Sequence, residues 1–207
     1  MMRRWILLLA ALLVTAALPA VAQAPIASGK VVAGTLSFDG HATVGDFVGT
    51  TDSVSGELTG APALAQVKGW VEAPVTSIRT GKGKRDTDMN KSMESGQYPM
   101  IRFQLDSITP GVPAGDTVAV TLHGAFVIHG VTRAVDLPGR VLVGQEHSRV
   151  WANTPLNLKD YKIGGLSKML GVLKMHENIE VHVDVTFGHQ ATEPPRYVVK
   201  LLEPKVD

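Results

Sequence analysis

The sequence predicts an all-β protein whose strands run antiparallel. Apolar and polar residues alternate in successive runs between Gly34 and Gly188, and such alternation gives each strand one dry face and one face toward water. Residues suited to chain reversal separate the runs, at Thr109-Pro110-Gly111, Ala114-Gly115-Asp116, Leu137-Pro138-Gly139 and Val143-Gly144. Many short strands with turns at this spacing indicate a closed barrel or a sandwich.

The first segment of the chain, residues 1–22, is predicted to be a signal peptide that is removed on export. A cationic start with Arg3 and Arg4 precedes an apolar run over 6–18 and a small-x-small cleavage site that ends at Ala22. We therefore expect a periplasmic protein or, alternatively, a secreted one. The paired arginines leave the twin-arginine route open, and the apolar run is shorter than the ~20 residues of a membrane-anchoring helix.

The rest of the chain is predicted to form one domain over residues 29–188, followed by a C-terminal extension over 189–207. Basic and acidic residues are nearly balanced, 20 against 19 in 207 residues, which argues against a polybasic nucleic-acid binder. Because the sequence contains no cysteine, it can form no disulfide, zinc–thiolate site or thiol nucleophile. An exported protein of this composition must be stabilised by its packed sheet.

Within the domain, one face of each predicted strand is apolar and is expected to point inward. The apolar faces carry Leu36 and Phe38; Val67, Gly69, Val71 and Ala73; Ile101, Phe103 and Leu105; Val118, Val120 and Leu122; and Ile179, Val181, Val183, Val185 and Phe187. Small inward residues leave room that larger side chains would fill. The interior is therefore either a dry core or a narrow cavity.

Two segments depart from the strand pattern and are predicted to be short helices. In residues 85–96, Asp86 or Asp88 can cap the helix, and Met89 and Met93 lie one turn apart on one side. In the second segment the apolar residues follow helical spacing: Leu166, Met169, Leu170 and Leu173. This second helix could be a packed cap, a lid over the barrel, or a lip that makes transient contact with a membrane.

The sequence contains no recognisable catalytic or metal-binding motif. It has no Gly-x-Ser-x-Gly elbow, His-Glu-x-x-His helix or phosphate-binding glycine loop, so we expect no enzymatic activity. Its histidines lack the spacing of a metal site, and His123 and His129 would lie about 20 Å apart on one extended strand. We interpret Arg85 and Asp86 as a pair that ties its loop onto the barrel.

Five motifs follow one another in a specific order: Thr76-Ser77-Ile78-Arg79-Thr80-Gly81, Arg85-Asp86, Tyr98-Pro99-Met100-Ile101-Arg102-Phe103, His129-Gly130-Val131-Thr132-Arg133 and Leu158-Lys159-Asp160-Tyr161-Lys162-Ile163. With the last alternating strand, this order resembles the YceI-like family of exported polyisoprenoid-binding proteins. The resemblance implies a lipocalin-like antiparallel β-barrel of about eight strands with one or two short helices. Many relatives have a histidine and paired aromatics between the Arg-Asp and Tyr-Pro motifs, where this chain has Met89 and Met93.

The resemblance also implies a function, which is to hold a long-chain polyisoprenoid or similar amphiphilic lipid in the barrel for storage or transport. The candidate ligand-binding residues are the apolar ones expected to face inward: Phe38, Val71, Phe103, Leu105, Val120, Leu122, Phe126, Met169, Leu173, Val183 and Val185. No metal or cofactor is expected beyond a bound isoprenoid or quinone-like molecule, and a homodimer is left open. The alternative is a solid barrel that acts in envelope stress or interaction through its outer surface, where Trp70 is expected to lie.

Overall fold

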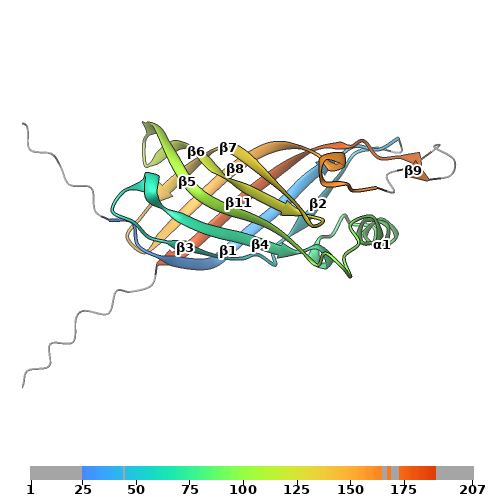
Figure 1. Cartoon of the computed structure of the whole chain (residues 1–207), viewed down its shortest axis with the longest axis horizontal. Helices are drawn as coiled ribbons and strands as arrows, with labels where there is room; N and C mark the ends of the chain where they lie inside the picture. The colour runs from blue at the N-terminus through green and yellow to red at the C-terminus, as the bar shows by residue number, and fades with distance from the viewer. Residues whose placement is uncertain (1–24, 44, 165–166, 169–172, 190–207) are drawn as a thin grey trace, which may run out of the picture.

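The computed structural model describes residues 25–43, 45–164, 167–168 and 173–189, and these form a closed antiparallel barrel of eight strands (Figure 1). The wall follows the order β11-β8-β7-β6-β5-β4-β3-β1, and pairing between β11 and β1 closes it. β2 and β3 share one place in the wall, because β1 pairs with β2 along one half and with β3 along the other. The expected all-β barrel is confirmed.

The strands of the barrel are β1 (Gly29–Gly40), β2 (Phe47–Thr51), β3 (Ser55–Thr59), β4 (Lys68–Pro74), β5 (Met100–Ala114), β6 (Thr117–Ile128), β7 (Val131–Val143), β8 (His147–Asn157) and β11 (Asn178–His189). A separate two-stranded hairpin consists of β9 (Ser167–Lys168) and β10 (Leu173–Lys174). The helices are α1 (Gly83–Ser92) and three short 3-10 turns, η1 (Leu64–Gln66), η2 (Val75–Ser77) and η3 (Leu158–Tyr161). Among the described residues, no helix has the length and apolar character needed to cross a membrane.

The alternating pattern that predicts β11 also explains how the strand packs. Ile179, Val185 and Phe187 are buried, and Val181 and Val183 lie on the same inward face, whereas the alternate residues belong to the opposite face. Val183 pairs with Leu36 of β1 on one side and with Ala152 of β8 on the other. These inward residues join one continuous apolar cluster with those of the other strands. β11 ends at His189, one residue inside the expected C-terminal extension, whose remaining residues lie outside the described part of the chain.

Two of the four predicted turns are wrong, because prolines that suggest reversals lie inside long strands. Pro110 belongs to β5, and Pro138 belongs to β7. β5 pairs with β4 only as far as Leu105, and β7 pairs with β8 only from Gly139 onward. Each proline therefore lies where one edge of its strand has no ladder partner, so its missing N–H costs no hydrogen bond on that edge. The other two turns are confirmed, and Gly115 in the β5–β6 hairpin has a positive φ of 61°.

The first predicted helix is confirmed, but its N-terminus differs from the prediction. α1 begins at Gly83, and its N-cap residue Lys82 makes no side-chain capping bond. Asp86 does not cap the helix, because its carboxylate accepts hydrogen bonds from Thr80 instead. Asp88 lies in the middle of α1.

The second predicted helix is wrong where the structure describes it. Ser167–Lys168 and Leu173–Lys174 pair as an antiparallel ladder, with Leu173 opposite Lys168. A helix of this length is marginal in water even with good spacing, and Gly171 weakens it further. A bridge between Ala42 and Met175 connects the end of this hairpin to the segment after β1.

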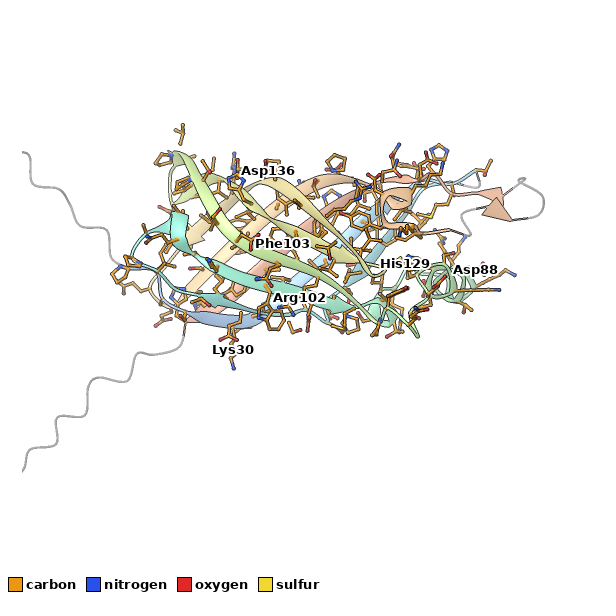
Figure 2. All side chains as sticks on the ribbon, in the orientation of Figure 1. Lys30, Asp88, Arg102, Phe103, His129 and Asp136 are labelled. Atoms are coloured by element: carbon orange, nitrogen blue, oxygen red, sulfur yellow. The ribbon has the colours of Figure 1, made fainter. Side chains whose placement is uncertain are left out.

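Helix α1 and the β9–β10 hairpin lie at one end of the barrel, as Figure 1 shows. At the other end, β1 begins at Gly29 opposite His189, the last residue of β11. We call the end with α1 and the β9–β10 hairpin the mouth. Asp88 of α1 and His129, from the turn between β6 and β7, both lie at this end (Figure 2).

Candidate ligand-binding cavity

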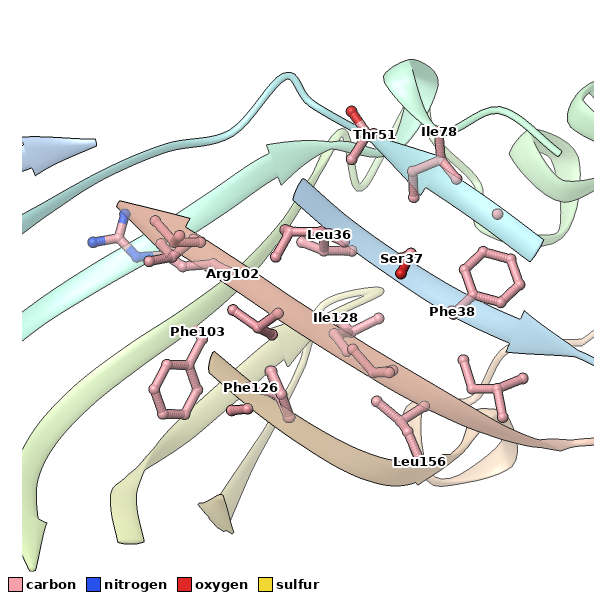
Figure 3. Close-up of a pocket in the computed structure, with 18 of the residues that line it drawn as sticks. Leu36, Ser37, Phe38, Thr51, Ile78, Arg102, Phe103, Phe126, Ile128 and Leu156 are labelled. Carbon is pink, nitrogen blue, oxygen red and sulfur yellow. The ribbon is translucent and has the colours of Figure 1, made fainter. Parts of the chain in front are cut away.

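The barrel encloses an elongated apolar cavity of about 530 Å³. Figure 3 shows part of its lining, with Leu36 and Phe38 on β1, Phe103 on β5, and Phe126 and Ile128 on β6. All the barrel strands except β3 contribute more than one lining residue, and α1 contributes Met89 among others. The volume is within the range of ~300–1,000 Å³ that is usual for small-molecule sites.

Most of the predicted ligand-binding residues lie on this cavity. The lining includes Phe38, Val71, Phe103, Leu105, Leu122, Phe126, Val183 and Val185. Val120 is buried in the core but is not among the lining residues. Met169 lies outside the described residues, and Leu173 is described only as part of β10. Whether these residues contact a ligand stays a prediction.

Several lining residues were predicted to face inward but were not included among the candidate ligand-binding residues. Leu36, Ile101 and Val181 lie two positions before predicted residues on the same strands, so the two-residue period of a strand places them on the same face. Other lining residues carry no such signal, because they come from segments outside the barrel strands. Ile78 follows η2, and Met93 follows α1. These two residues reach the cavity only through the tertiary fold, which packs the segments after η2 and α1 against the end of the barrel.

An aromatic pair and a guanidinium connect α1 to the barrel at the mouth. The rings of Phe38 and Phe47 meet edge to face, with centroids 6.0 Å apart. The Arg85 guanidinium lies over the Phe47 ring, 4.0 Å from its centroid. Phe38, Phe47 and Arg85 all line the cavity. A cation placed over an aromatic face in this way is held by the negative face of the ring.

Asp86 provides the second connection between α1 and the barrel. Its carboxylate accepts hydrogen bonds from the backbone N–H of Thr80 at 2.9 Å and from the Thr80 hydroxyl at 2.6 Å. The hydroxyl bond in particular lowers the pKa of Asp86 below the usual range of an aspartate. The neighbouring residue Arg79 exchanges two backbone hydrogen bonds of 2.9 Å with Thr50 of β2. The prediction that Arg85 and Asp86 tie their loop onto the barrel is confirmed.

The turn between β6 and β7 is held against the segment that follows α1. His129 has a positive φ of 51°, and its Nδ1 donates a hydrogen bond of 3.0 Å to the carbonyl of Tyr161 in η3. Its Nε2 lies 3.6 Å from a carboxylate oxygen of Glu94, and its ring is 4.7 Å from that of Tyr98. β6 ends at Ile128, so His123 and His129 do not share one strand.

Trp70 does not form an open outer surface. Its ring is half-buried and lies under the guanidinium of Arg102, 4.4 Å from the centroid. Arg102 in turn pairs with Glu72 at 3.2 Å. The guanidinium therefore covers one face of the indole, and its pairing with Glu72 holds it there.

The ionisable groups of the lining are few: Asp46, Lys82, Lys84, Arg85, Asp88 and Arg102. All but Arg102 come from α1, its N-cap or the segment just before β2. Within the described residues, no three His, Asp or Glu side chains come together in a group that could hold a metal ion. The site is an apolar chamber with charged groups gathered near one end.

Comparison with known families decides what kind of barrel this is. The model of the YceI-like domain matches residues 30–187, which is most of the chain. The chain belongs to the YceI-like domain family. No curated protein matches it in sequence.

Solved structures share the YceI-like fold at low sequence identity. A polyisoprenoid binding domain from Saccharophagus degradans, implicated in plant cell wall breakdown, is 17% identical, with 80% of this chain and 99% of that chain covered and a TM-score of 0.66. BcnA from Burkholderia cenocepacia is 16% identical, with coverages of 74% and 95% and a TM-score of 0.60. A YceI protein from Campylobacter jejuni is 18% identical, with coverages of 69% and 84% and a TM-score of 0.54.

Two methionines of this YceI-like chain lie at the mouth. Met89 and Met93 both line the cavity beside α1. Unbranched methionine side chains adapt to irregular apolar surfaces. This part of the lining can therefore adjust to the shape of an apolar ligand.

Proposed function

We propose that this protein binds the apolar chain of a long amphiphile, a polyisoprenoid or similar lipid, and stores or transports it after export to the periplasm. The observation that carries the proposal is the apolar cavity of about 530 Å³ inside the barrel. A solid barrel acting through its outer surface has no use for such a cavity. Trp70, the best candidate for an outer contact, is covered by Arg102.

The lining explains why a lipid chain is the fitting ligand. Side chains such as Leu36, Ile101 and Val183 offer hydrocarbon surface and no hydrogen bonds. Transfer of a lipid chain from water to such surroundings contributes about 0.8 kcal/mol per CH₂. A long chain therefore binds tightly with little polar recognition, whereas a polar metabolite would lose its hydration without replacement.

The fold relatives lend further support. The Saccharophagus degradans domain, whose fold the chain shares along 80% of its length, is described as polyisoprenoid binding. The proposal extends that binding class to this chain, and it assigns no catalytic role to the barrel. A bound quinone-like molecule is an alternative ligand of the same shape.

Native mass spectrometry of protein purified from its own host tests the proposal. We expect an added mass that organic extraction releases as a long-chain lipid. Repeated isolation of ligand-free protein, together with no binding of added geranylgeraniol, would overturn it. N-terminal sequencing of the same preparation tests export, and a first residue of Gln23 is expected.

A further inference from the structure

The mouth of the cavity carries more positive than negative side chains. Lys82, Lys84 and Arg85 line it from the first turn of α1 and its N-cap, and Asp46 and Asp88 are the acidic residues beside them. The rest of the lining is almost entirely apolar apart from Arg102. Fixed positive charge is thus concentrated where the polar end of a bound lipid would lie.

The acidic groups at the mouth offset only part of this charge, because two carboxylates, Asp46 and Asp88, stand beside three cations in the lining. Asp46 accepts a hydrogen bond from His41 at 2.9 Å, and Asp88 also has an interaction partner. Among the described residues, Lys82, Lys84 and Arg85 form no ion pair, whereas Arg149 of the wall pairs with Asp184 at 2.6 Å. The cations of the mouth are therefore available to a ligand.

Arg85 is the best organised of the three. Its guanidinium is fixed over Phe47, whose ring packs against Phe38 inside the cavity. The adjacent Asp86 accepts its hydrogen bonds from Thr80, and its interaction with Arg85 is a weaker charge–charge attraction without a hydrogen bond. A planar guanidinium with free N–H groups, held by stacking, suits the oxygen atoms of phosphate or carboxylate.

We infer that the lipid bound by this protein carries an anionic head group of the phosphate or carboxylate class, which Arg85, Lys82 and Lys84 bind at the mouth while the chain fills the cavity. The inference rests on the proposed function and adds the chemical class of the ligand. Arg85 provides a fixed contact, because it stacks on Phe47, and the exposed lysines add longer-range attraction. The neutral form of the same lipid would leave the three cations without a partner.

A pair of probes with one chain and two head groups tests this inference. Binding of geranylgeranyl monophosphate and of geranylgeraniol is measured with the full exported protein at low and at high salt. The phosphate is expected to bind about tenfold more tightly at low salt, with the preference shrinking as salt screens the charges. Equal affinity for both probes would overturn the inference and leave the proposed function intact. Failure of both probes to bind would overturn the two together.

Variants at the mouth test which residues cause the preference for the phosphate probe. Arg85→Gln and the double variant Lys82→Gln/Lys84→Gln are expected to reduce the ratio of the phosphate affinity to the alcohol affinity severalfold. The matched control is Lys91→Gln, an exposed lysine of the same helix that does not line the cavity. An equal loss in the control would mean general surface attraction and would contradict the assigned site.

A competition experiment distinguishes binding of a lipid head group from binding of free phosphate. Inorganic phosphate in large excess is expected to compete weakly with geranylgeranyl monophosphate, because it gains nothing from the cavity. Competition at similar concentrations would mean that the mouth binds phosphate independently of the chain, and would contradict a head-group site joined to the cavity.

Discussion

The wall and the mouth of this barrel are held together by different means. In the wall, β11 pairs with β1 on one side and with β8 on the other along most of its length. Near the mouth one ladder is incomplete, since β7 pairs with β8 only from Gly139 to Val143. The earlier residues of β7 are connected to η3 by side chains instead, with Arg133 bonded to the carbonyl and the carboxylate of Asp160 at 2.9 and 3.2 Å.

This difference gives the two regions different contributions to stability within one small domain. Ladders and buried aliphatic side chains fix the wall, and a change there must disturb many contacts at once. The mouth depends on a few side-chain contacts, such as Arg85 stacked on Phe47 and the Arg133–Asp160 ion pair. Elements with few buried contacts open most easily, so under the proposed function we expect a lipid to enter at the mouth.

The largest expected effect comes from removing a buried ring of the wall. Phe187 is 2% exposed, and Phe187→Ala should lower the free energy of unfolding by about 3–5 kcal/mol. Met89→Ala in α1, a half-buried position at the mouth, should cost less than about 1.5 kcal/mol. Urea unfolding of both variants measures this contrast, and equal losses would contradict the division between wall and mouth.

Alanine substitutions at two glycines, one in the wall and one at the mouth, should change the free energy of unfolding in opposite directions. A Cβ on Gly124 of β6 would lie 2.1 Å from the carbonyl oxygen of Gln104, so Gly124→Ala should destabilise the protein by about 1–3 kcal/mol. A Cβ on Gly83 of α1 meets nothing within 4 Å. Gly83→Ala should therefore stabilise by about 0.4–1 kcal/mol, because it restricts the unfolded chain. Thermal unfolding checks both, and a well-tolerated Gly124→Ala would refute the close approach of β5 and β6.

The smallest effect concerns an ion pair on the outer wall. The Arg149 guanidinium donates two hydrogen bonds, of 2.8 and 2.6 Å, to Asp184, and this contact lowers the pKa of that carboxyl. A lowered folded-state pKa stabilises the protein above the ordinary aspartate pKa, and the contribution is lost as pH falls through the folded-state value. Asp184→Asn should therefore cost under about 1 kcal/mol at pH 7 and nothing in strong acid.

Urea unfolding at pH 7 and in strong acid measures that difference. Asp116→Asn is the control, since Asp116 lies in the β5–β6 hairpin and forms no ion pair with any described residue. A loss for Asp184→Asn that persists unchanged in acid would show that the ion pair is not its cause.

The wall could be predicted from the sequence far better than the mouth. The alternation over 179–187 predicts both ends of β11 to within two residues, because apolar residues at every second position mark a strand with one face toward the interior. Pro138 misled the prediction, since a proline at a half-paired strand edge looks the same in sequence as one in a turn. Its position could be understood only once the pairing of β7 was known.

The mouth depends on contacts between segments far apart in the chain. The spacing of Leu166, Met169 and Leu173 is helical, yet the described part of that segment pairs as strands. Arg85 reaches Phe47 across the barrel end, and no local pattern signals that contact. The sequence predicts α1 itself, with Met89 and Met93 on one side, and the role of Arg85 and Asp86 in tying it to the barrel, but not the partners that these two residues contact.

The central claim is that the interior of the barrel holds a lipid chain, and two neighbouring substitutions on β1 test it most directly. Leu36 lines the cavity opposite Val183, whereas Thr35 is exposed on the outer face. Leu36→Trp should fill part of the cavity and weaken binding of geranylgeraniol at least about tenfold, since two displaced CH₂ groups already suffice. Thr35→Trp should leave binding unchanged.

Native mass spectrometry of bound lipid in wild type and both variants is the decisive measurement, with circular dichroism to show that each is folded. If Leu36→Trp does not fold, Val183→Phe narrows the same part of the cavity. Loss of lipid in the inward variant, with full occupancy in Thr35→Trp, is the predicted result. Full occupancy in a folded inward variant would contradict the claim that the ligand lies in the cavity.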